Sequence, residues 1–158
     1  MSEALSPAAE RVQELLRAAG SEARVRQLPV TARTSADAAA AIGCTVAQIA
    51  KSLLFKSKSG KPVLVIASGA NRVDESKIAT ALGEPIGKAD ASFVRDTTGY
   101  AIGGVAPIGH AMLPRIFIDQ DLRQHIVIWA AAGHSHAVFP STAAELERLT
   151  HGAVIETK

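Results

Sequence analysis

One lysine stands inside the stretch VAQIAKSLLF, residues 46–55, where the pattern predicts a short helix that passes into an apolar strand. An unpaired charge is costly to bury, so a strand that buries Leu53 and Phe55 would pack more easily without an ammonium at its mouth. Lys51 therefore has two interpretations. It either offsets the negative end of the helix at the surface, or it binds an anionic group of a ligand.

The segment TTGYAIGGVAPIGH, residues 97–110, is rich in glycine. The glycines are Gly99, Gly103, Gly104 and Gly109. Glycine permits positive φ and lets backbone amides approach a ligand closely, so the segment could present N–H donors to a carbonyl or a phosphate. It lacks the Gly-Lys-Ser/Thr ending of a P-loop and the spacing of a dinucleotide-binding fingerprint. A turn-rich connection between strands is the alternative interpretation.

Two further groups of side chains would support other chemistries. Cys44 directly precedes the helix predicted at Thr45, where a thiol can have a lowered pKa and act as a nucleophile; a small buried hydrophobic residue is the alternative. His134 and His136 are two residues apart, so on a strand they share one face and could hold a metal with an acidic partner. No third ligand stands at a diagnostic spacing, and a strand end or a pocket wall is the alternative.

The elements that must position these residues alternate between helix and strand. Caps, apolar faces and terminal glycines predict helices at 7–19, 36–43, 46–51, 75–83, 91–99 and 143–151. Apolar runs predict a short strand near 25–28, a hairpin over 52–69 with its tip at Ser59-Gly60, and later strands or loops at 115–119, 126–133 and 136–140. The order predicts an α+β fold with a mixed, mainly antiparallel twisted sheet surrounded by helices.

Composition limits the functional classes independently of any motif. The chain has 158 residues, 47% of them hydrophobic, which suits a single domain over residues 1–158. A formal charge of +2 excludes a polybasic coating protein, and one cysteine excludes an internal disulfide. The start MSEALSPAAERV lacks the basic and apolar regions of a signal peptide, and no apolar run approaches the roughly 20 residues of a membrane span. We expect a cytoplasmic protein that binds neither membrane nor DNA.

Three motifs in this order closely resemble the YbaK/ProX family, which also occurs as the editing insertion of bacterial prolyl-tRNA synthetases. They are IAKSLLF at 49–55, VDESKIATALG at 73–83 and TTGYAIGGVAPIG at 97–109. The resemblance covers residues 34–109 in recognisable motifs and extends more loosely to the final helix. Family members are free-standing deacylases that hydrolyse mischarged tRNA, chiefly tRNA(Pro) carrying a small amino acid.

The resemblance implies the editing-domain fold and the same reaction here. The expected enzyme is a metal-independent aminoacyl-tRNA hydrolase that uses no cofactor. Its substrate is the 3′ acceptor end of tRNA carrying alanine, cysteine, serine, threonine or 2-aminobutyrate, and a prolyl-tRNA synthetase is a candidate partner. A non-catalytic module that binds tRNA or an aminoacyl ligand is the alternative, and a metal-dependent hydrolase is a third hypothesis.

Carried over residue by residue, the functional lysine of the family falls on Lys51 and its G-x-x-x-P loop on residues 103–107. The lysine would position the 3′-terminal phosphate or ribose, and the amides of Gly104 and Val105 would stabilise the oxyanion that ester hydrolysis develops. Pro107 would stiffen the loop. The expected catalytic set is Lys51, Gly103, Gly104 and Val105; the expected substrate-binding set is Ala106, Pro107, Cys44 and His136; no metal ligand is expected.

Basic residues gather near the predicted hairpin tip. Lys56, Lys58 and Lys61 lie there, and Arg72 and Lys77 follow. Together they could form a phosphate track for the acceptor stem, or they could simply be a solvated, aggregation-resistant turn. Aromatic content of 4% makes base-stacking platforms scarce, which favours shape and backbone contacts over base readout.

Overall fold

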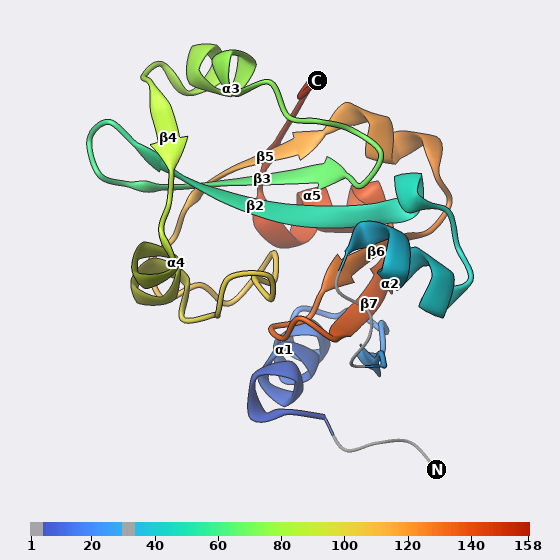
Figure 1. Ribbon diagram of the computed structural model, residues 1–158. Coiled ribbons are helices and arrows are strands. Elements are labelled where there is room, and N and C mark those ends of the chain that lie inside the picture. Colours follow the sequence, from blue (N-terminus) through green and yellow to red (C-terminus); the bar gives the residue numbers. More distant parts are fainter. Residues whose placement is uncertain (1–4, 30–33) are drawn as a thin grey trace.

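The computed structural model describes residues 5–29 and 34–158, and its strands form one sheet (Figure 1). The helices are α1 (Pro7–Ala18), α2 (Ser35–Ile42), α3 (Glu75–Leu82), α4 (Ala91–Thr98) and α5 (Ala143–Thr150), with 3₁₀ turns η1 (Val46–Gln48) and η2 (Gln120–Gln124). The strands are β1 (Arg26–Gln27), β2 (Ile49–Ser57), β3 (Pro62–Ser68), β4 (Ile86–Lys88), β5 (Arg115–Asp119), β6 (Ile128–Ala131), β7 (Ala137–Ser141) and β8 (Ala153–Ile155).

The sheet runs β1-β7-β6-β2-β3-β5-β8, and β4 adds to β2 beside this path. Within the described ranges, four strand pairs are antiparallel and three are parallel. The predicted α+β class with a mixed, mainly antiparallel sheet is therefore confirmed. Among the described residues no helix is long and apolar enough to cross a membrane.

Local sequence explains the helices. Thr34 caps α2, Asp74 caps α3 and Asp90 caps α4, each accepting from a backbone N–H of the first turn. Helix α2 carries a full capping box, because Asp37 also accepts from the amide of Thr34. The predicted helix starts are confirmed at these places.

Both faces of the sheet are covered around β3. Even-numbered residues of β3, such as Leu64 and Ile66, face the cluster formed with α1, α5 and the loop after α4. Odd-numbered residues, such as Val63 and Val65, face a second cluster that includes Ile78 of α3. Figure 1 shows α3 on one side of β2 and β3 and α4 on the other. Alternation along a strand therefore decides which layer a side chain reaches.

One boundary differs from the prediction, and it concerns Lys51. The expected helix at 46–51 is a single 3₁₀ turn that ends at Gln48, and β2 begins at Ile49. The prediction that a helix ends near Lys51 is wrong, because β-branched and apolar residues there pair with β3 and β6. Lys51 is thus inside a strand, and the helix-dipole interpretation does not apply to it.

Strand β2 has an edge that is covered only at its two ends. On the side away from β3, β6 pairs with Ile49 and Ala50, and β4 pairs with residues 55–57. No strand in the described part of the chain pairs with residues 51–54 on this side. We call this stretch, residues 51–54, the open edge of β2.

Candidate active site

A pocket of about 340 Å³ lies beside the open edge of β2. Its walls come from β2, from the end of β4, from α4, and from the segment that follows α4, residues 99–109, which we call the glycine-rich loop. The lining residues are Ser52, Leu53, Leu54, Phe55, Lys88, Ala89, Val94, Ile102, Gly103 and Val105. Because most of these side chains are apolar, the pocket suits an uncharged group.

The main chain of the open edge contributes polar groups to this pocket. In the β2–β3 pair the amide of Ser57 donates to Lys61 O (2.9 Å), so the odd-numbered residues of β2 are those bonded to β3. The even-numbered residues direct N–H and C=O to the opposite edge. At Ser52 and Leu54 no described strand meets them, so their peptide groups can bond a ligand in the pocket.

The glycine-rich loop is held in shape by its own hydrogen bonds. The Tyr100 hydroxyl donates to Ile108 O (2.7 Å), and His110 Nε2 lies 2.7 Å from Ala106 O. A carbonyl can only accept, so His110 carries its proton on Nε2. The rings of Tyr100 and His110 also meet edge to face at 6.0 Å. These contacts close the loop on itself and fix the residues between them.

The loop amides divide into bonded and available donors. The Gly104 amide donates to Ala101 O (3.0 Å), which completes a turn. The amides of Gly103 and Val105 have no acceptor among the described residues, and both residues line the pocket. The free amides in this part of the loop are therefore those of Gly103 and Val105, whereas the expected pair of donors was Gly104 and Val105.

Gly104 has a different role, which is close packing. A Cβ built on it would lie 2.9 Å from His134 Cα and 3.0 Å from His134 C. Only glycine lets the loop lie this close to the backbone of the turn between β6 and β7. Ala106 and Pro107, expected to bind substrate, are buried behind the pocket wall, where Ala106 O accepts from His110.

Lys51 lies on the other face of β2 from the glycine-rich loop. It pairs with Ala67, which belongs to the cluster under α3. Ser52 and Leu54, the neighbouring even-numbered residues, face the loop and α4. No hydrogen bond between described residues joins Lys51 to the loop. The structure therefore places Lys51 at one end of the open edge, beside the pocket but outside its lining.

The ammonium of Lys51 is held by a partly buried polar network. Its Nζ donates to Asn71 O (2.6 Å), and the Asn71 side-chain amide donates to Asp119 Oδ2 and Asp121 Oδ2 (both 2.8 Å). Asp119 is 1% exposed and also accepts from the Ser68 amide (3.0 Å). Burial lowers the pKa of Lys51, and the charge of Asp119 opposes that shift. One ammonium proton is used by Asn71, so two remain for a ligand.

Cys44 and His136 lie away from the pocket lining. Burial raises the pKa of the Cys44 thiol, which favours the interpretation as a small hydrophobic residue over that as a nucleophile. His136 O accepts from Leu28 N (2.6 Å), and its amide donates to His134 Nδ1 (3.1 Å). Among the described residues no three His, Cys, Asp or Glu side chains are grouped as a metal site.

Sequence reasoning missed several residues of the pocket. Ser52 lines it, and the buried Ser52 hydroxyl has no hydrogen-bond partner among the described residues. Lys88 and Val94 reach it from β4 and α4. The alternation next to Lys51 could have pointed to Ser52. Nothing in the local pattern indicated Lys88, because β4 was not predicted and its pairing with β2 is a tertiary contact.

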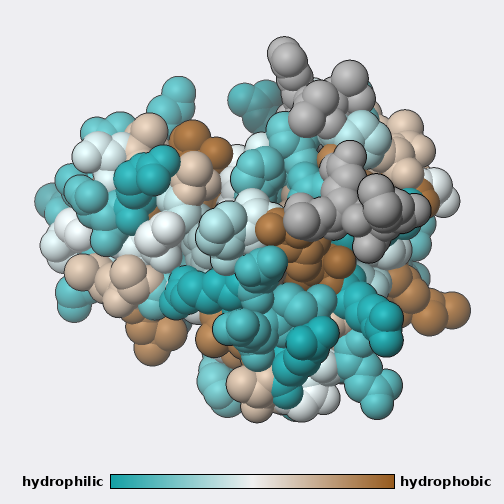
Figure 2. All heavy atoms as spheres, turned by 90° about the horizontal axis from the view of Figure 1, so that it is seen from below, coloured by the Kyte–Doolittle hydropathy of each residue, from teal (hydrophilic) through white to brown (hydrophobic). Residues whose placement is uncertain are grey.

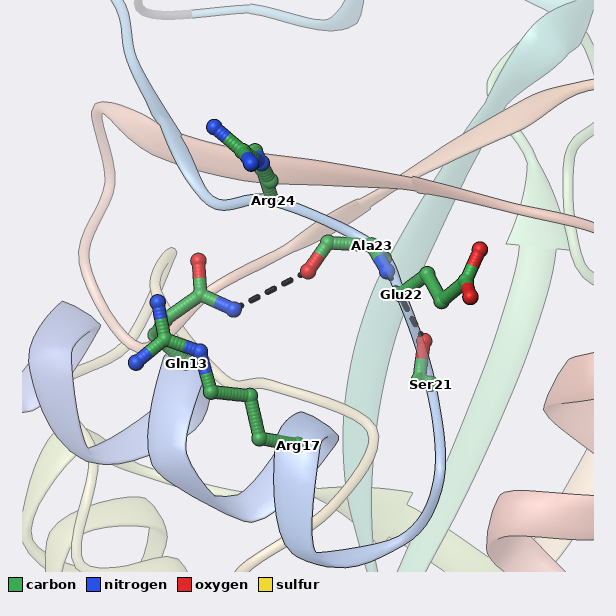
Figure 3. Close-up of a pocket in the computed structure, with 6 residues that line it drawn as sticks. All are labelled: Gln13, Arg17, Ser21, Glu22, Ala23 and Arg24. Carbon is green, nitrogen blue, oxygen red and sulfur yellow. Dashed lines mark hydrogen bonds between the residues drawn. The ribbon is translucent and has the colours of Figure 1, made fainter.

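A second pocket, of about 490 Å³, lies between α1 and residues 21–24 (Figure 3). Its polar groups bond one another: Gln13 Nε2 donates to Ala23 O (2.9 Å), and the Ala23 amide donates to Ser21 Oγ (3.2 Å). Ser21 Oγ in turn donates to Glu145 of α5 (3.1 Å). These bonds anchor the segment to α1 and α5, which explains the polar residues there structurally.

His110 gives a test of the loop's hydrogen bonds. Burial lowers its pKa, the bond to Ala106 O raises it, and the charge of Arg11 lowers it. The unfolded chain binds this proton near pH 6.5 and the folded chain only at lower pH, so the free energy of unfolding should fall as pH drops below about 6.5. His110→Gln keeps a donor for Ala106 O but does not titrate, so the free energy of unfolding of this variant should fall less over the same pH range. Urea unfolding at pH 7.5, 6.5 and 5.5 measures this; parallel losses in both proteins would contradict it.

Comparison with known proteins points to one family. A model of the aminoacyl-tRNA editing domain matches residues 30–149. The crystal structure of a candidate trans-editing enzyme for prolyl tRNA synthetase has a TM-score of 0.93 and 41% identity, over 98% of this chain and 99% of that chain.

Two curated proteins are also similar. The protein YwhH of Bacillus subtilis (strain 168) is 29% identical over 130 residues, which are 82% of this chain and 83% of that protein. The proline–tRNA ligase of Brachyspira hyodysenteriae (strain ATCC 49526 / WA1) is 34% identical over 74 residues, which are 46% of this chain and 13% of the ligase.

Proposed function

This chain belongs to the aminoacyl-tRNA editing domain family, and on that premise we propose that it is a trans-editing deacylase. It hydrolyses the ester that joins a wrongly attached small amino acid to the 3′ ribose of tRNA, with tRNA(Pro) as the first candidate, in the cytoplasm. The observation that carries the proposal is the pocket that the open edge of β2 shares with Gly103 and Val105, whose amides have no acceptor among the described residues.

The loop supplies the electrostatic part of the reaction. Water adds to the ester carbonyl carbon, and the carbonyl oxygen becomes an oxyanion that accepts from the amides of Gly103 and Val105. Each such donor contributes roughly 3 kcal/mol in comparable sites. The ester C–O bond then breaks, the ribose oxygen takes up a proton, and free amino acid and tRNA are released. An aminoacyl ester is already activated, so the step needs neither a covalent nucleophile nor a metal.

The open edge and Lys51 hold the two ends of the substrate. The peptide groups of Ser52 and Leu54 bond the aminoacyl group in the pocket. The ammonium of Lys51, fixed by Asn71 at the end of the open edge, uses its remaining protons on the terminal phosphate or ribose. Its role is positioning.

The pocket sets the choice of amino acid. Its apolar walls at Val94 and Val105 favour an uncharged side chain, and the candidates are those of alanine, cysteine, serine, threonine and 2-aminobutyrate. One methylene group in such a pocket changes the transition-state free energy by about 1–3 kcal/mol. We therefore expect one or two of these esters to be hydrolysed much faster than the rest.

The test measures release of amino acid from tRNA(Pro) charged in turn with each of these five amino acids and with proline, with and without chelator. Fast release of one or two small amino acids, with proline spared and no effect of chelator, is the expected result. Release that chelator abolishes would replace this mechanism with metal-assisted hydrolysis. Binding of tRNA without release of any amino acid would overturn the enzyme in favour of a binding module, for which a prolyl-tRNA synthetase would be the partner to examine.

A further inference from the structure

Two lysines at the β4 end of the pocket lack acidic partners. Lys56 and Lys88 are both exposed, and no carboxylate of the described residues lies within 4.0 Å of either ammonium. Glu84, an acidic residue on the neighbouring turn, instead accepts from the amide and the hydroxyl of Ser59 (2.9 and 2.7 Å). The two lysines therefore present unneutralised charge beside the pocket.

The register of β4 on β2 places these lysines on either side of the strand pair. Lys88 lies opposite Phe55 and lines the pocket itself. Lys56 lies opposite Gly87, and its ammonium is 5.1 Å from the centre of the Phe93 ring on α4. Lys88 shares a face with its partner Phe55, and Lys56, the residue after Phe55, points to the opposite face. The two ammonium groups therefore flank the end of the pocket.

Lys51 completes this arrangement at the other end. It shares a face of β2 with Phe55, opposite which Lys88 lies, and the two positions are four residues apart, about 13 Å along the strand. Positive charge thus brackets the open edge. The positive potential between these charges attracts an anionic chain to the pocket and repels a cationic one.

Of the other lysines expected in a phosphate track, Lys77 is engaged elsewhere, whereas Lys58 and Lys61 have no ion pair among the described residues but do not line the pocket. Lys77 bonds Glu156 at 3.3 Å and also donates to Lys158 O, and Lys158 bonds Asp121 at 3.2 Å. Seen from below, the molecule's surface is largely hydrophilic and its apolar residues lie in separate patches (Figure 2). The exposed Lys56 and Lys88 beside the pocket favour an anionic partner.

We propose that Lys56 and Lys88 bind backbone phosphates of the single-stranded 3′ end of tRNA and guide its aminoacylated terminus into the pocket. This inference rests on the proposed function for the identity of the ligand. With Lys51 on the terminal ribose, Lys88 at the other end of the open edge contacts the phosphate nearest the terminal nucleotide, and Lys56 contacts one farther from it. The contacts read charge and not sequence, as phosphate contacts do.

Salt dependence of tRNA affinity tests the inference without relying on catalysis. The dissociation constant of uncharged tRNA(Pro) is measured between 50 and 200 mM salt for wild type, Lys56→Gln, Lys88→Gln and the double variant. Each lost phosphate contact on a single strand should reduce the slope of log affinity against log salt by about 0.7. Over this range wild type should weaken about 2.6-fold more than each single variant, and about 7-fold more than the double variant.

Two controls make the result specific. Lys77→Gln removes a half-buried, ion-paired lysine and should leave the slope unchanged. A tRNA that lacks its 3′ CCA nucleotides should show the same slope with wild type and Lys88→Gln.

Unchanged slopes in Lys56→Gln and Lys88→Gln would overturn the inference even if deacylation is observed. Reduced slopes with no hydrolysis of any ester would uphold it and overturn the deacylase instead.

Discussion

Replacing Lys51 by alanine should lower kcat/KM for a mischarged tRNA by about 30-fold to several thousandfold. Removing one partner of a partly buried, charge-assisted contact costs roughly 2–5 kcal/mol, which sets this range. Deacylation kinetics at several tRNA concentrations measure the effect. Lys51→Met keeps the unbranched stem, but its kcat/KM should fall as far, because the charge is what binds the phosphate or ribose.

The same substitution should leave the fold intact. Burial lowers the pKa of Lys51, so the folded state already disfavours its charged form. Asp119 keeps its bonds from Asn71 and from the Ser68 amide when the ammonium is absent. The melting temperature should therefore stay within a few degrees of wild type. Lys77→Ala is the matched control for activity. A Lys51→Ala enzyme within threefold of wild type would remove Lys51 from the mechanism.

The second large effect is expected at Gly104. Its Cβ in Gly104→Ala would lie 2.9–3.1 Å from the Cα, C and N atoms of His134, and these backbone atoms have no rotamer through which to give way. The loop must shift, and with it the amides of Gly103 and Val105. Misplacement of reacting groups by about 1 Å can cost 10²-fold in rate, so kcat should fall by about 10- to 100-fold.

Gly87→Ala is the matched control for that change. Gly87 lies in β4 near the pocket, its φ is outside the left-handed region, and its Cβ would meet no atom within 4 Å. Its kinetics should equal those of wild type. His134→Ala should not rescue Gly104→Ala, because the clash involves only the main chain of His134. Rescue by His134→Ala, or full activity of Gly104→Ala, would contradict the packing argument.

These predictions depend on different kinds of information. Lys51 and the G-x-x-x-P loop were found by motif, and the motif led correctly to the family and the fold class. The role of each loop amide could not be found that way. The Gly104 amide is bonded to Ala101 O, in a loop that Tyr100 and His110 also hold through bonds to Ile108 O and Ala106 O. Motif spacing marks a loop but not which of its donors are already bonded.

The sequence alone determined what local chemistry controls. Caps such as Thr34, Asp74 and Asp90 and the apolar hairpin at 52–69 specified helices and strands through hydrogen bonds and side-chain alternation between near neighbours. Only the tertiary structure decided how β4 and β6 cover the two ends of β2, and hence that Ser52 faces the pocket while Lys51 faces Asn71. Those pairings join segments far apart in the chain, and a shift of one residue in register would exchange the two faces.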